Sequence, residues 1–333
     1  TERILRSRAS NCGVIAMDVD DSDKTLAGVS SATYTVHMFE EAQLYAPVTE
    51  GPDGVQVHLA DDHPGAHDPD YRRRRNEIAA GALAWRAGQR LPHVVYTEAE
   101  HQIWATVSGE LHSKHEKYAI RAFREGKDAL GLPEDRVPQL QEVSDGLSAL
   151  TGFQLHPAAG LVPLDVFYGS LADRVFHSTQ YLRHDSTPLY TPEPDILHEI
   201  VGHGNLLASP QIAEVKRLAG EAARRCRTKE GLQFVADVFW YTIEFGVMYE
   251  EGELRCYGAG LLSSYGEIEE FRGADVRAID FAEMGTFAYD ITHYQPVLFA
   301  CRGMSELTDR VGGFFADFTD ETPARLIKGR KIA

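Results

Sequence analysis

Apolar residues recur at three- and four-residue spacing over most of the chain, which is the pattern of helices with one buried face. An acid and a proline at residues 68–70 predict a helix start, and the stretches 76–86 and 98–123 continue the helical pattern. Further helices are predicted near residues 139–150, 165–175, 193–207, 210–225, 231–249, 264–271 and 303–316, with short extended pieces near 153–155 and 255–257. The pattern predicts a mainly α domain with minor β structure.

The two ends of the chain depart from this helical pattern. Residues 31–39 alternate in the manner of a strand, and residues 54–59 follow a Gly-Pro-Asp-Gly turn, so a small β-hairpin or sheet is predicted there. We expect residues 1–58 to form an N-terminal extension that is too short for a substantial separate domain. Residues 317–333 are polar and are predicted to form a C-terminal tail. A single domain over residues 59–316 lies between them.

Composition and charge narrow the class of protein. The 333 residues are 43% hydrophobic, which is enough for a sizeable core, and the formal net charge of −17 argues against nucleic acids or anionic membranes as partners. No apolar run reaches membrane-spanning length and no signal-peptide pattern opens the chain, so we expect a cytoplasmic protein. Widely spaced cysteines fit reduced thiols better than disulfides or a zinc site: Cys12, Cys226, Cys256 and Cys301.

Two segments carry the candidate chemistry. Residues 192–203 contain His198, Glu199 and His203, and residues 240–246 hold Glu244 among aromatic and aliphatic side chains. Burial of such a carboxylate is costly unless a cation compensates its charge, and a metal ion does so well. Two imidazoles and one carboxylate form the set that holds non-haem Fe(II) and leaves coordination positions open. These residues are therefore candidate ligands of one metal ion.

The spacing of the histidines leaves other interpretations open. On a regular α-helix, residues five apart differ by roughly 140°, so His198 and His203 do not share a face as the histidines of HExxH do. They converge only if the side chains reach around the helix start. Otherwise His198 is a surface residue, His203 caps a helix end, and Glu244 pairs with an arginine. A zinc hydrolase using His198, Glu199 and His203, or a metal-free binding protein, are the alternatives from other classes.

Several ordered blocks resemble the pterin-dependent aromatic amino acid hydroxylases, the family of the phenylalanine, tyrosine and tryptophan hydroxylases. The resemblance covers roughly residues 60–305, the catalytic domain alone, and is closest to the phenylalanine enzymes. Its blocks are DHPG at 62–65, DPDYR at 68–72, IWATV at 103–107, VPQL at 137–140, TGF at 151–153, RVFH at 174–177, YLRH at 181–184, YTPEPD at 190–195 and GAGLLSS at 258–264.

The resemblance implies a catalytic iron and pterin domain over residues 59–316, with a role for each matching position. His198, His203 and Glu244 are the implied Fe(II) ligands, and Glu199 acts on the pterin through water. Phe167 offers a flat face for the pterin, a tetrahydrobiopterin or a relative. Arg183 matches the arginine that binds the substrate carboxylate, although a buried ion pair is its alternative. The implied pterin contacts are Gly160, Leu161, Val162, Phe167, His177 and Glu199; the implied amino-acid contacts are Arg183, Thr191, Phe176, Pro194, Trp240, Ser263 and Tyr289.

The chain also departs from the family pattern. Pro163 and Leu164 stand where the family usually has serines, and no counterpart of the animal regulatory domain is expected. Ile291 is apolar where the tyrosine enzymes carry an acid, which favours an unsubstituted ring. The implied reaction is therefore the conversion of L-phenylalanine, oxygen and tetrahydropterin into L-tyrosine, water and a hydroxylated pterin. Tryptophan hydroxylation and meta-hydroxylation of phenylalanine remain alternatives within the family.

Overall fold

The computed structural model describes residues 46–160, 162–290 and 293–330, the side chain of Arg330 excepted, and the predicted mainly α class is confirmed. The longer helices are α3 (Pro69–Ala84), α4 (Glu98–Tyr118), α5 (Arg121–Leu130), α6 (Leu140–Thr151), α9 (Pro210–Arg225) and α10 (Lys229–Phe239). The shorter helices are α7 (Leu164–Leu171), α8 (Asn205–Leu207), α11 (Ala259–Ser263), α12 (Glu267–Glu270), α13 (Phe281–Met284), α14 (Met304–Glu306), α15 (Gly312–Asp317), α16 (Thr322–Arg330) and the 3₁₀ helix η3 (Phe271–Gly273).

Capping side chains fix where the first helices begin. The Asp68 carboxylate accepts the backbone N–H of Asp70 at the start of α3, and Thr97 and Glu100 form a capping box at the start of α4. The continuous helix predicted over 98–123 is wrong, because the backbone becomes extended after Tyr118. There Ile120 donates its N–H to the carbonyl of Cys256, and α5 begins only afterwards.

β-structure is minor but exceeds the two predicted pieces. β3 (Gln154–Ala158) pairs in parallel with β4 (Val175–Thr179), with Gln154 opposite Val175. The helix predicted to reach residue 175 ends at Leu171, and Arg174, at φ +57°, turns the chain into β4. A mixed sheet has the strand order β6 (Glu253–Cys256), β5 (Val247–Glu250), β8 (Val297–Cys301), β7 (Asp275–Ala278). β5 and β6 form a hairpin, and β8 runs parallel to both of its neighbours.

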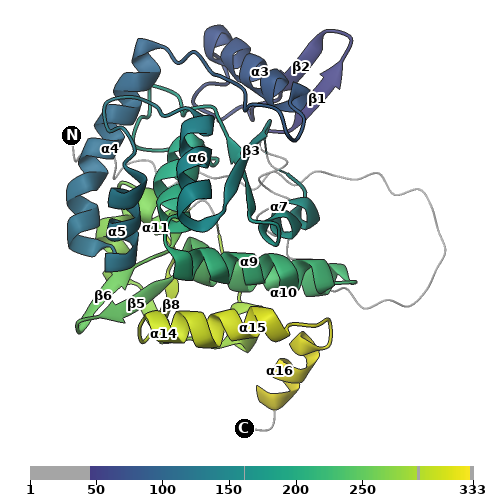
Figure 1. Ribbon diagram of the computed structural model, residues 1–333, viewed down its shortest axis with the longest axis vertical. Coiled ribbons are helices and arrows are strands. Elements are labelled where there is room, and N and C mark those ends of the chain that lie inside the picture. Colours follow the sequence, from purple (N-terminus) through teal and green to yellow (C-terminus); the bar gives the residue numbers. More distant parts are fainter. Residues whose placement is uncertain (1–45, 161, 291–292, 331–333) are drawn as a thin grey trace, which may run out of the picture. The chain divides into compact units, whose positions relative to one another are not determined.

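π-helical segments interrupt the α-helical regions, and one of them lies among several packed elements. η1 (His198–Gly204) packs against α11, α8, β4 and α6, while η2 (Trp240–Glu244) continues α10 and contacts α11. A further segment is η4 (Leu307–Val311). α9 runs between α7 and α15 and packs against both (Figure 1). The contiguous apolar core includes the fully buried rings of Phe123, Phe153, Phe176, Tyr241 and Phe299.

The hairpin predicted around residues 54–59 is present, whereas the C-terminal segment is more ordered than the sequence predicted. β1 (Val48–Gly51) and β2 (Gly54–Val57) form an antiparallel hairpin that packs on α3, while the predicted strand at 31–39 lies outside the described residues. The segment expected to be a polar tail contains α16, which packs against α13.

Two further findings concern the membrane and the thiols. Within the described ranges, no helix combines the length and apolar character that crossing a membrane requires. The cysteines that the structure describes carry free thiols; they are Cys226, Cys256 and Cys301, whereas Cys12 lies outside the described residues.

Candidate functional site

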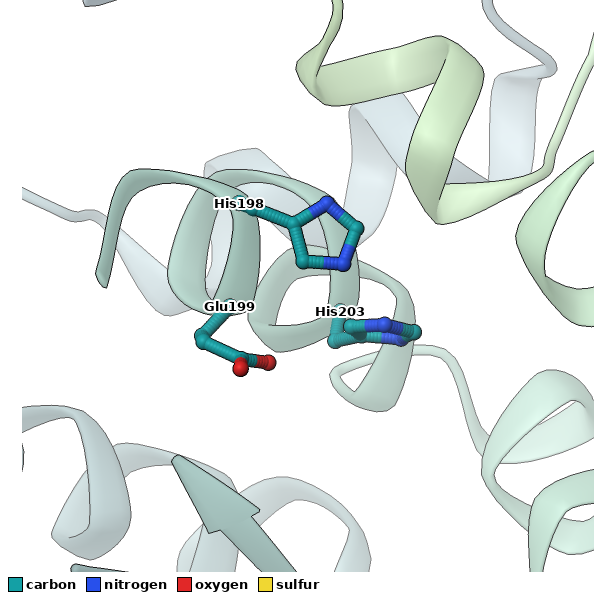
Figure 2. Close-up of side chains that lie close together, drawn as sticks. All are labelled: His198, Glu199 and His203. Atoms are coloured by element: carbon teal, nitrogen blue, oxygen red, sulfur yellow. The ribbon is translucent and has the colours of Figure 1, made fainter. Parts of the chain in front are cut away.

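The π-helical geometry of η1 brings His198 and His203 together. In a π-helix the backbone bonds join residues five apart, so a side chain lies on the same face as its fifth neighbour. The two imidazole rings stand nearly perpendicular, with 4.9 Å between their centroids, and Figure 2 shows both projecting from this segment with Glu199. The angle that separates residues five apart on an α-helix therefore does not apply to these two histidines. Ligand atoms of His198, Glu199 and His203 lie within 4.8 Å of one another.

Hydrogen bonds determine which nitrogen each imidazole presents. Nδ1 of His198 lies 2.8 Å from Oγ of Ser263, and that hydroxyl donates to the carbonyl of Ala259. The hydroxyl oxygen therefore accepts the Nδ1 proton, which leaves the lone pair on Nε2. Nδ1 of His203 lies 2.9 Å from Nζ of Lys216. The Nε2 atom of each imidazole is therefore free to face a common point.

Glu244, at the end of η2, faces these nitrogens. Its Oε1 lies 3.0 Å from Nε2 of His203, and its Oε2 lies 3.8 Å from Nε2 of His198. Burial lowers the pKa of His198 to about 4 and holds the pKa of His203 well below its usual range. Both imidazoles are therefore neutral near pH 7, the form that binds metal. Two neutral nitrogen donors and one carboxylate, all on buried helical segments, fit a divalent metal ion.

Two carboxylates, those of Glu199 and Glu244, lie beside the imidazoles, and their pKa values indicate which one ionises more readily. Burial, and then the charge of Glu244, raise the pKa of Glu199 well above its usual range. Burial also raises the pKa of Glu244, but His198 and Lys216 oppose that shift. Since neighbouring like charges disfavour double ionisation, these shifts make Glu244 the more readily ionised of the two acids. Both carboxylates lie close to the two imidazoles, so distance alone does not show which acid would bind a metal ion.

A cavity of about 270 Å³ opens beside these donors. It is lined by residues from β3, β4, α7, η1, η2, α11, α12 and several connecting loops. Most of its exposed lining is apolar, which suits flat organic molecules more than ions. Its lining comprises Ala158, Gly160, Val162, Phe167, His177, Thr179, Arg183, Leu189, Tyr190, Thr191, Pro192, Glu193, Pro194, His198, Glu199, His203, Trp240, Glu244, Phe245, Gly260, Ser263, Ser264, Glu267, His293 and Tyr294.

The residues expected to contact a pterin lie along this cavity where they are described. Gly160, Val162, Phe167 and His177 all line it, while Leu161 lies outside the described residues. The Phe167 ring is half-buried, with its edge packed near the Phe176 ring. Burial lowers the pKa of His177 to about 4, so its imidazole is neutral.

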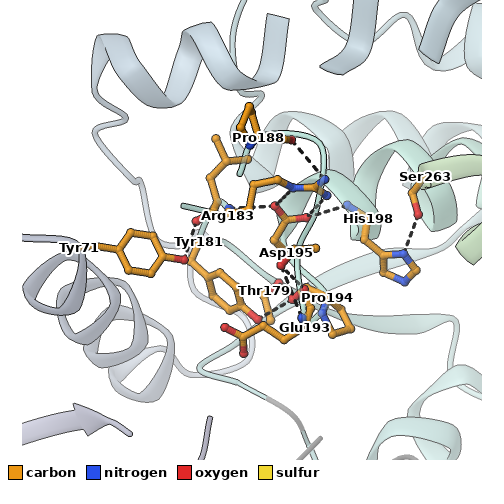
Figure 3. Close-up of polar contacts among 12 residues, drawn as sticks. Tyr71, Thr179, Tyr181, Arg183, Pro188, Glu193, Pro194, Asp195, His198 and Ser263 are labelled. Atoms are coloured by element: carbon orange, nitrogen blue, oxygen red, sulfur yellow. Dashed lines mark hydrogen bonds and ion pairs between the residues drawn. The ribbon is translucent and has the colours of Figure 1, made fainter. Parts of the chain in front are cut away.

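Arg183 lines the cavity and is also committed to a buried ion pair. Its Nε and Nη2 donate to the two carboxylate oxygens of Asp195, at 2.8 and 2.9 Å (Figure 3). The arginine holds the pKa of Asp195 below its usual range, although burial opposes this shift. Nη1 makes a long contact of 3.5 Å with the carbonyl of Pro188. The ion pair with Asp195 is therefore compatible with the expected binding of a substrate carboxylate by Arg183.

The remaining residues expected around the amino acid divide into two groups. Thr191, Pro194, Trp240 and Ser263 line the cavity. Tyr289 instead stacks against Trp240 at 4.6 Å, and its hydroxyl donates to Asp237. Ile291, expected to bear on substrate choice, lies outside the described residues.

Phe176 was expected to contact the amino acid, but it is absent from the cavity lining. It is fully buried behind the cavity, with its ring 4.8 Å from that of His203. The reason is the strand β4, in which successive side chains point to opposite faces. His177 and Thr179 line the cavity, whereas Phe176 points into the core. Because the segment was predicted to be the end of a helix, this alternation was not foreseen.

Some cavity residues were missed. Glu193 lies within a quoted block, and its carboxylate accepts a 2.5 Å hydrogen bond from the buried Arg75. Glu267 is buried, its Oε1 accepts the backbone N–H of Gln295 at 2.7 Å, and burial raises its pKa to about 7. The exposed rings of Tyr190 and Tyr294 stand at the rim. Nothing in the local sequence marks Glu267 or Tyr294 as cavity residues, because tertiary contacts bring them there.

A helical domain whose cavity presents two imidazoles and a carboxylate has the donor set of a mononuclear non-haem iron enzyme. Comparison with known proteins makes the class specific. The chain belongs to the family of biopterin-dependent aromatic amino acid hydroxylases, whose family model matches residues 53–323. It is accordingly a pterin-dependent aromatic amino acid monooxygenase, and the zinc hydrolase weighed from the sequence has no support.

The relatives agree with this family. The chain is 46% identical to phenylalanine 3-hydroxylase of Streptomyces coeruleorubidus over 80% of this chain and 96% of that protein. It is 39% identical to phenylalanine-4-hydroxylase of Bos taurus over 77% of this chain, but spans only 58% of that longer protein. A Chromobacterium violaceum phenylalanine hydroxylase structure with iron (III) and 7,8-dihydrobiopterin matches with a TM-score of 0.63 and 30% identity, over 72% of this chain and 84% of that one.

Proposed function

We propose that this chain uses Fe(II) and a tetrahydropterin to hydroxylate the aromatic ring of L-phenylalanine. The observation that carries the proposal is the pair of Nε2 atoms that face the two oxygens of Glu244, while both Nδ1 atoms are engaged elsewhere. The solved Chromobacterium violaceum relative with iron and dihydrobiopterin supports the choice of metal and cofactor. Phenylalanine is the substrate named for most of the similar proteins.

In this proposal His198, His203 and Glu244 hold the metal, which together with the reduced pterin supplies the oxygen-activating chemistry. The residues of the chain bind, orient and keep water out. A metal ion held by these three residues would border the cavity, because all three side chains line it. Glu199, whose pKa burial raises, would hydrogen-bond toward the pterin, directly or through water.

The pterin would lie against Phe167, because a flat heterocycle gains most from an aromatic face. Gly160, Leu161 and Val162 would contact its edge through their backbone, and neutral His177 would border the same side. Pro163 and Leu164 replace serines of the family pattern and begin α7 here. Hydroxyl contacts are therefore absent from these two positions, and the backbone contributes more to pterin binding.

The amino acid would lie with its carboxylate toward Arg183 and its ring toward the metal. Asp195 holds the Arg183 guanidinium through two nitrogens, which leaves Nη1 to bind a carboxylate oxygen. Thr191 and Ser263 border that end of the cavity. Pro194 and Trp240 would flank the ring, with Tyr289 supporting Trp240 and Phe176 supporting His203 from behind.

The position of hydroxylation has two candidates. The resemblance of the sequence blocks to the phenylalanine enzymes favours the para position and L-tyrosine. The 46% identity to a phenylalanine 3-hydroxylase, over nearly the whole of that protein, favours meta-tyrosine as the second candidate. A small change in ring orientation separates the two products, since the same oxidant reaches adjacent carbons.

Product analysis tests the proposal. Purified chain would be incubated with Fe(II), a synthetic tetrahydropterin, oxygen and each of phenylalanine, tyrosine and tryptophan, and the hydroxylated products separated by chromatography against para- and meta-tyrosine standards. We expect one tyrosine isomer from phenylalanine and little turnover of the other two amino acids. The Glu244→Gln variant is expected to form no product. Turnover of tryptophan alone, or full activity of Glu244→Gln, would refute the proposal.

A further inference from the structure

Lys216 is a buried lysine that the proposed function does not use. It lies on α9 and is 0% exposed. Lysine is almost never fully buried unless it is paired. Its Nζ atom lies 2.9 Å from Nδ1 of His203 and 5.2 Å from the centre of the Phe176 ring. The amino group therefore sits directly behind a proposed metal ligand.

The chemistry of the imidazole defines what this contact does. A neutral imidazole that offers Nε2 to a metal carries its proton on Nδ1, and that N–H needs an acceptor. For His198 the acceptor is the Ser263 hydroxyl. For His203 the atom within hydrogen-bond distance is Nζ of Lys216, and the two nitrogens share one hydrogen bond. The two ligands are thus supported by different chemical groups.

We propose that Lys216 is a positioning residue for His203. The hydrogen bond between its Nζ and Nδ1 of His203 holds the ring so that Nε2 faces Glu244, 3.0 Å away. The Phe176 ring packs near the same imidazole, with centroids 4.8 Å apart, and limits its rotation. α9 is itself fixed between α7 and α15, so the nitrogen is held by packed helices. The inference rests on the proposed function, because it concerns a ligand of the proposed metal.

A purely electrostatic role for Lys216 predicts the opposite result. A lysine that only compensated Glu199 and Glu244 would repel a divalent cation, so its removal would strengthen metal binding. A lysine that orients His203 would weaken metal binding when removed. The direction of the change in affinity therefore separates the two roles.

The test is the affinity for Fe(II) and for Co(II), measured by anaerobic titration of the purified chain, the Lys216→Met variant and the exposed control Lys229→Met. Methionine keeps similar length and volume without a hydrogen-bonding nitrogen. We expect about a 10- to 100-fold loss of affinity in Lys216→Met, as for other partners of metal-bound histidine. The visible spectrum of the Co(II) form should also change, because one ligand is no longer held. Lys229→Met should match the unmodified chain.

Thermal unfolding of the metal-free proteins checks the fold. Lys216→Met should still unfold in one cooperative transition, although it leaves Nδ1 of His203 without its hydrogen-bond partner. An affinity that is unchanged or higher in Lys216→Met would overturn the inference. If that variant does not fold, Lys216→Gln replaces it; its acceptor ends one bond shorter, so a smaller loss is expected, and an equal or higher affinity would again overturn the inference.

The outcome is distinguishable from a failure of the proposed function. If the unmodified chain does not bind Fe(II), or if His203→Ala still binds it with full affinity, the metal site itself is wrong. If the unmodified chain binds Fe(II), His203→Ala does not, and Lys216→Met binds as tightly as the unmodified chain, only the role of Lys216 is wrong.

Discussion

Asp195 connects the two functional ends of the cavity. Its carboxylate accepts N–H bonds from the Arg183 side chain and from the backbone of both Arg183 and His198 (Figure 3). The proposed carboxylate-binding arginine and the first proposed metal ligand are therefore held by one fully buried acid. A change at Arg183 affects both substrate binding and the folded structure, because Asp195 loses its counter-charge.

Replacing Arg183 with methionine is expected to raise the KM for phenylalanine strongly and to lower the free energy of unfolding. Removal of one partner of a buried ion pair typically costs about 3–5 kcal/mol. The double variant Arg183→Met/Asp195→Asn should recover much of the stability but not the KM. Steady-state kinetics and chemical denaturation measure the two effects. An unchanged KM would place the substrate carboxylate elsewhere in the cavity.

Glu267 makes the stability of the folded state depend on pH. Burial raises the pKa of its carboxyl group to about 7, above the ordinary value of 4.5. The folded state thus binds this proton more tightly than the unfolded state, so stability is favoured below pH 4.5 and declines as pH rises through about 7. Glu267→Gln should remove this decline.

The measurement is the free energy of unfolding of metal-free Glu267→Gln and of the unmodified chain at pH 5 and pH 8. We expect the variant to gain stability relative to the unmodified chain as pH rises. The exposed Glu270→Gln, on the same short helix, is the control and should show no such gain. A difference that is the same at both pH values would contradict the raised pKa.

At the scale of elements, the π-helices decide the geometry of the site. Each proposed metal-binding segment is π-helical, η1 with both histidines and η2 with Glu244 at its end. In η2 the backbone N–H of Phe245 reaches the carbonyl of Trp240, five residues earlier, at 2.9 Å. π-Helical segments are rare in proteins, but those that occur often lie at functional sites. Tight packing of η1 on α11 keeps the Ser263 hydroxyl beside His198.

Gly202 marks a close approach between η1 and α11. A methyl group on Gly202 would lie 2.7 Å from the carbonyl oxygen of Ala259. Gly202→Ala should therefore destabilise the fold by about 1–3 kcal/mol through overpacking and weaken Fe(II) binding, because α11 also carries Ser263.

The matched control is Gly109→Ala in α4, where a methyl group would meet no atom within 4 Å. Alanine at an exposed helix position should raise stability by up to about 1 kcal/mol. Chemical denaturation and anaerobic Fe(II) titration measure both variants. Equal stability changes in the two variants would show that η1 is not closely packed on α11.

At the scale of the whole molecule, the site is assembled from segments that are distant in the chain. Cavity residues range from Ala158 to Tyr294, and the proposed ligands come from helical segments more than thirty residues apart. A metal ion bound by residues of both η1 and η2 would link these two segments only in the folded state. The unfolded chain has no such preformed site, so metal binding should stabilise the fold as a whole.

Thermal and chemical unfolding under anaerobic conditions should therefore show stabilisation by Fe(II). At a free concentration of about 100 times Kd, the expected gain is about 2.7 kcal/mol. Glu244→Gln should lose this gain, whereas the exposed Glu270→Gln should keep it. Stabilisation of Glu244→Gln to the same extent as the unmodified chain would show that the metal binds elsewhere.

Much of the fold and of the candidate site could be predicted from the sequence, because those features depend on local pattern. Apolar spacing predicts most helices, and capping residues such as Asp68 and Thr97 mark where they begin. The donors His198, His203 and Glu244 stand out by residue type and surroundings, and the ordered blocks identify the family.

Only the tertiary structure decided the rest. Whether two histidines five residues apart converge depends on a π-helix, whose hydrogen bonds differ from those of an α-helix by a single residue of register. The position of Phe176 depends on β4, which exists because β3 lies beside it. Lys216 and Glu267 reach the site through the packing of separate helices, and residue type gives no sign of such contacts. Local periodicity carries information about neighbours along the chain, while the partners of a buried polar group are set by packing.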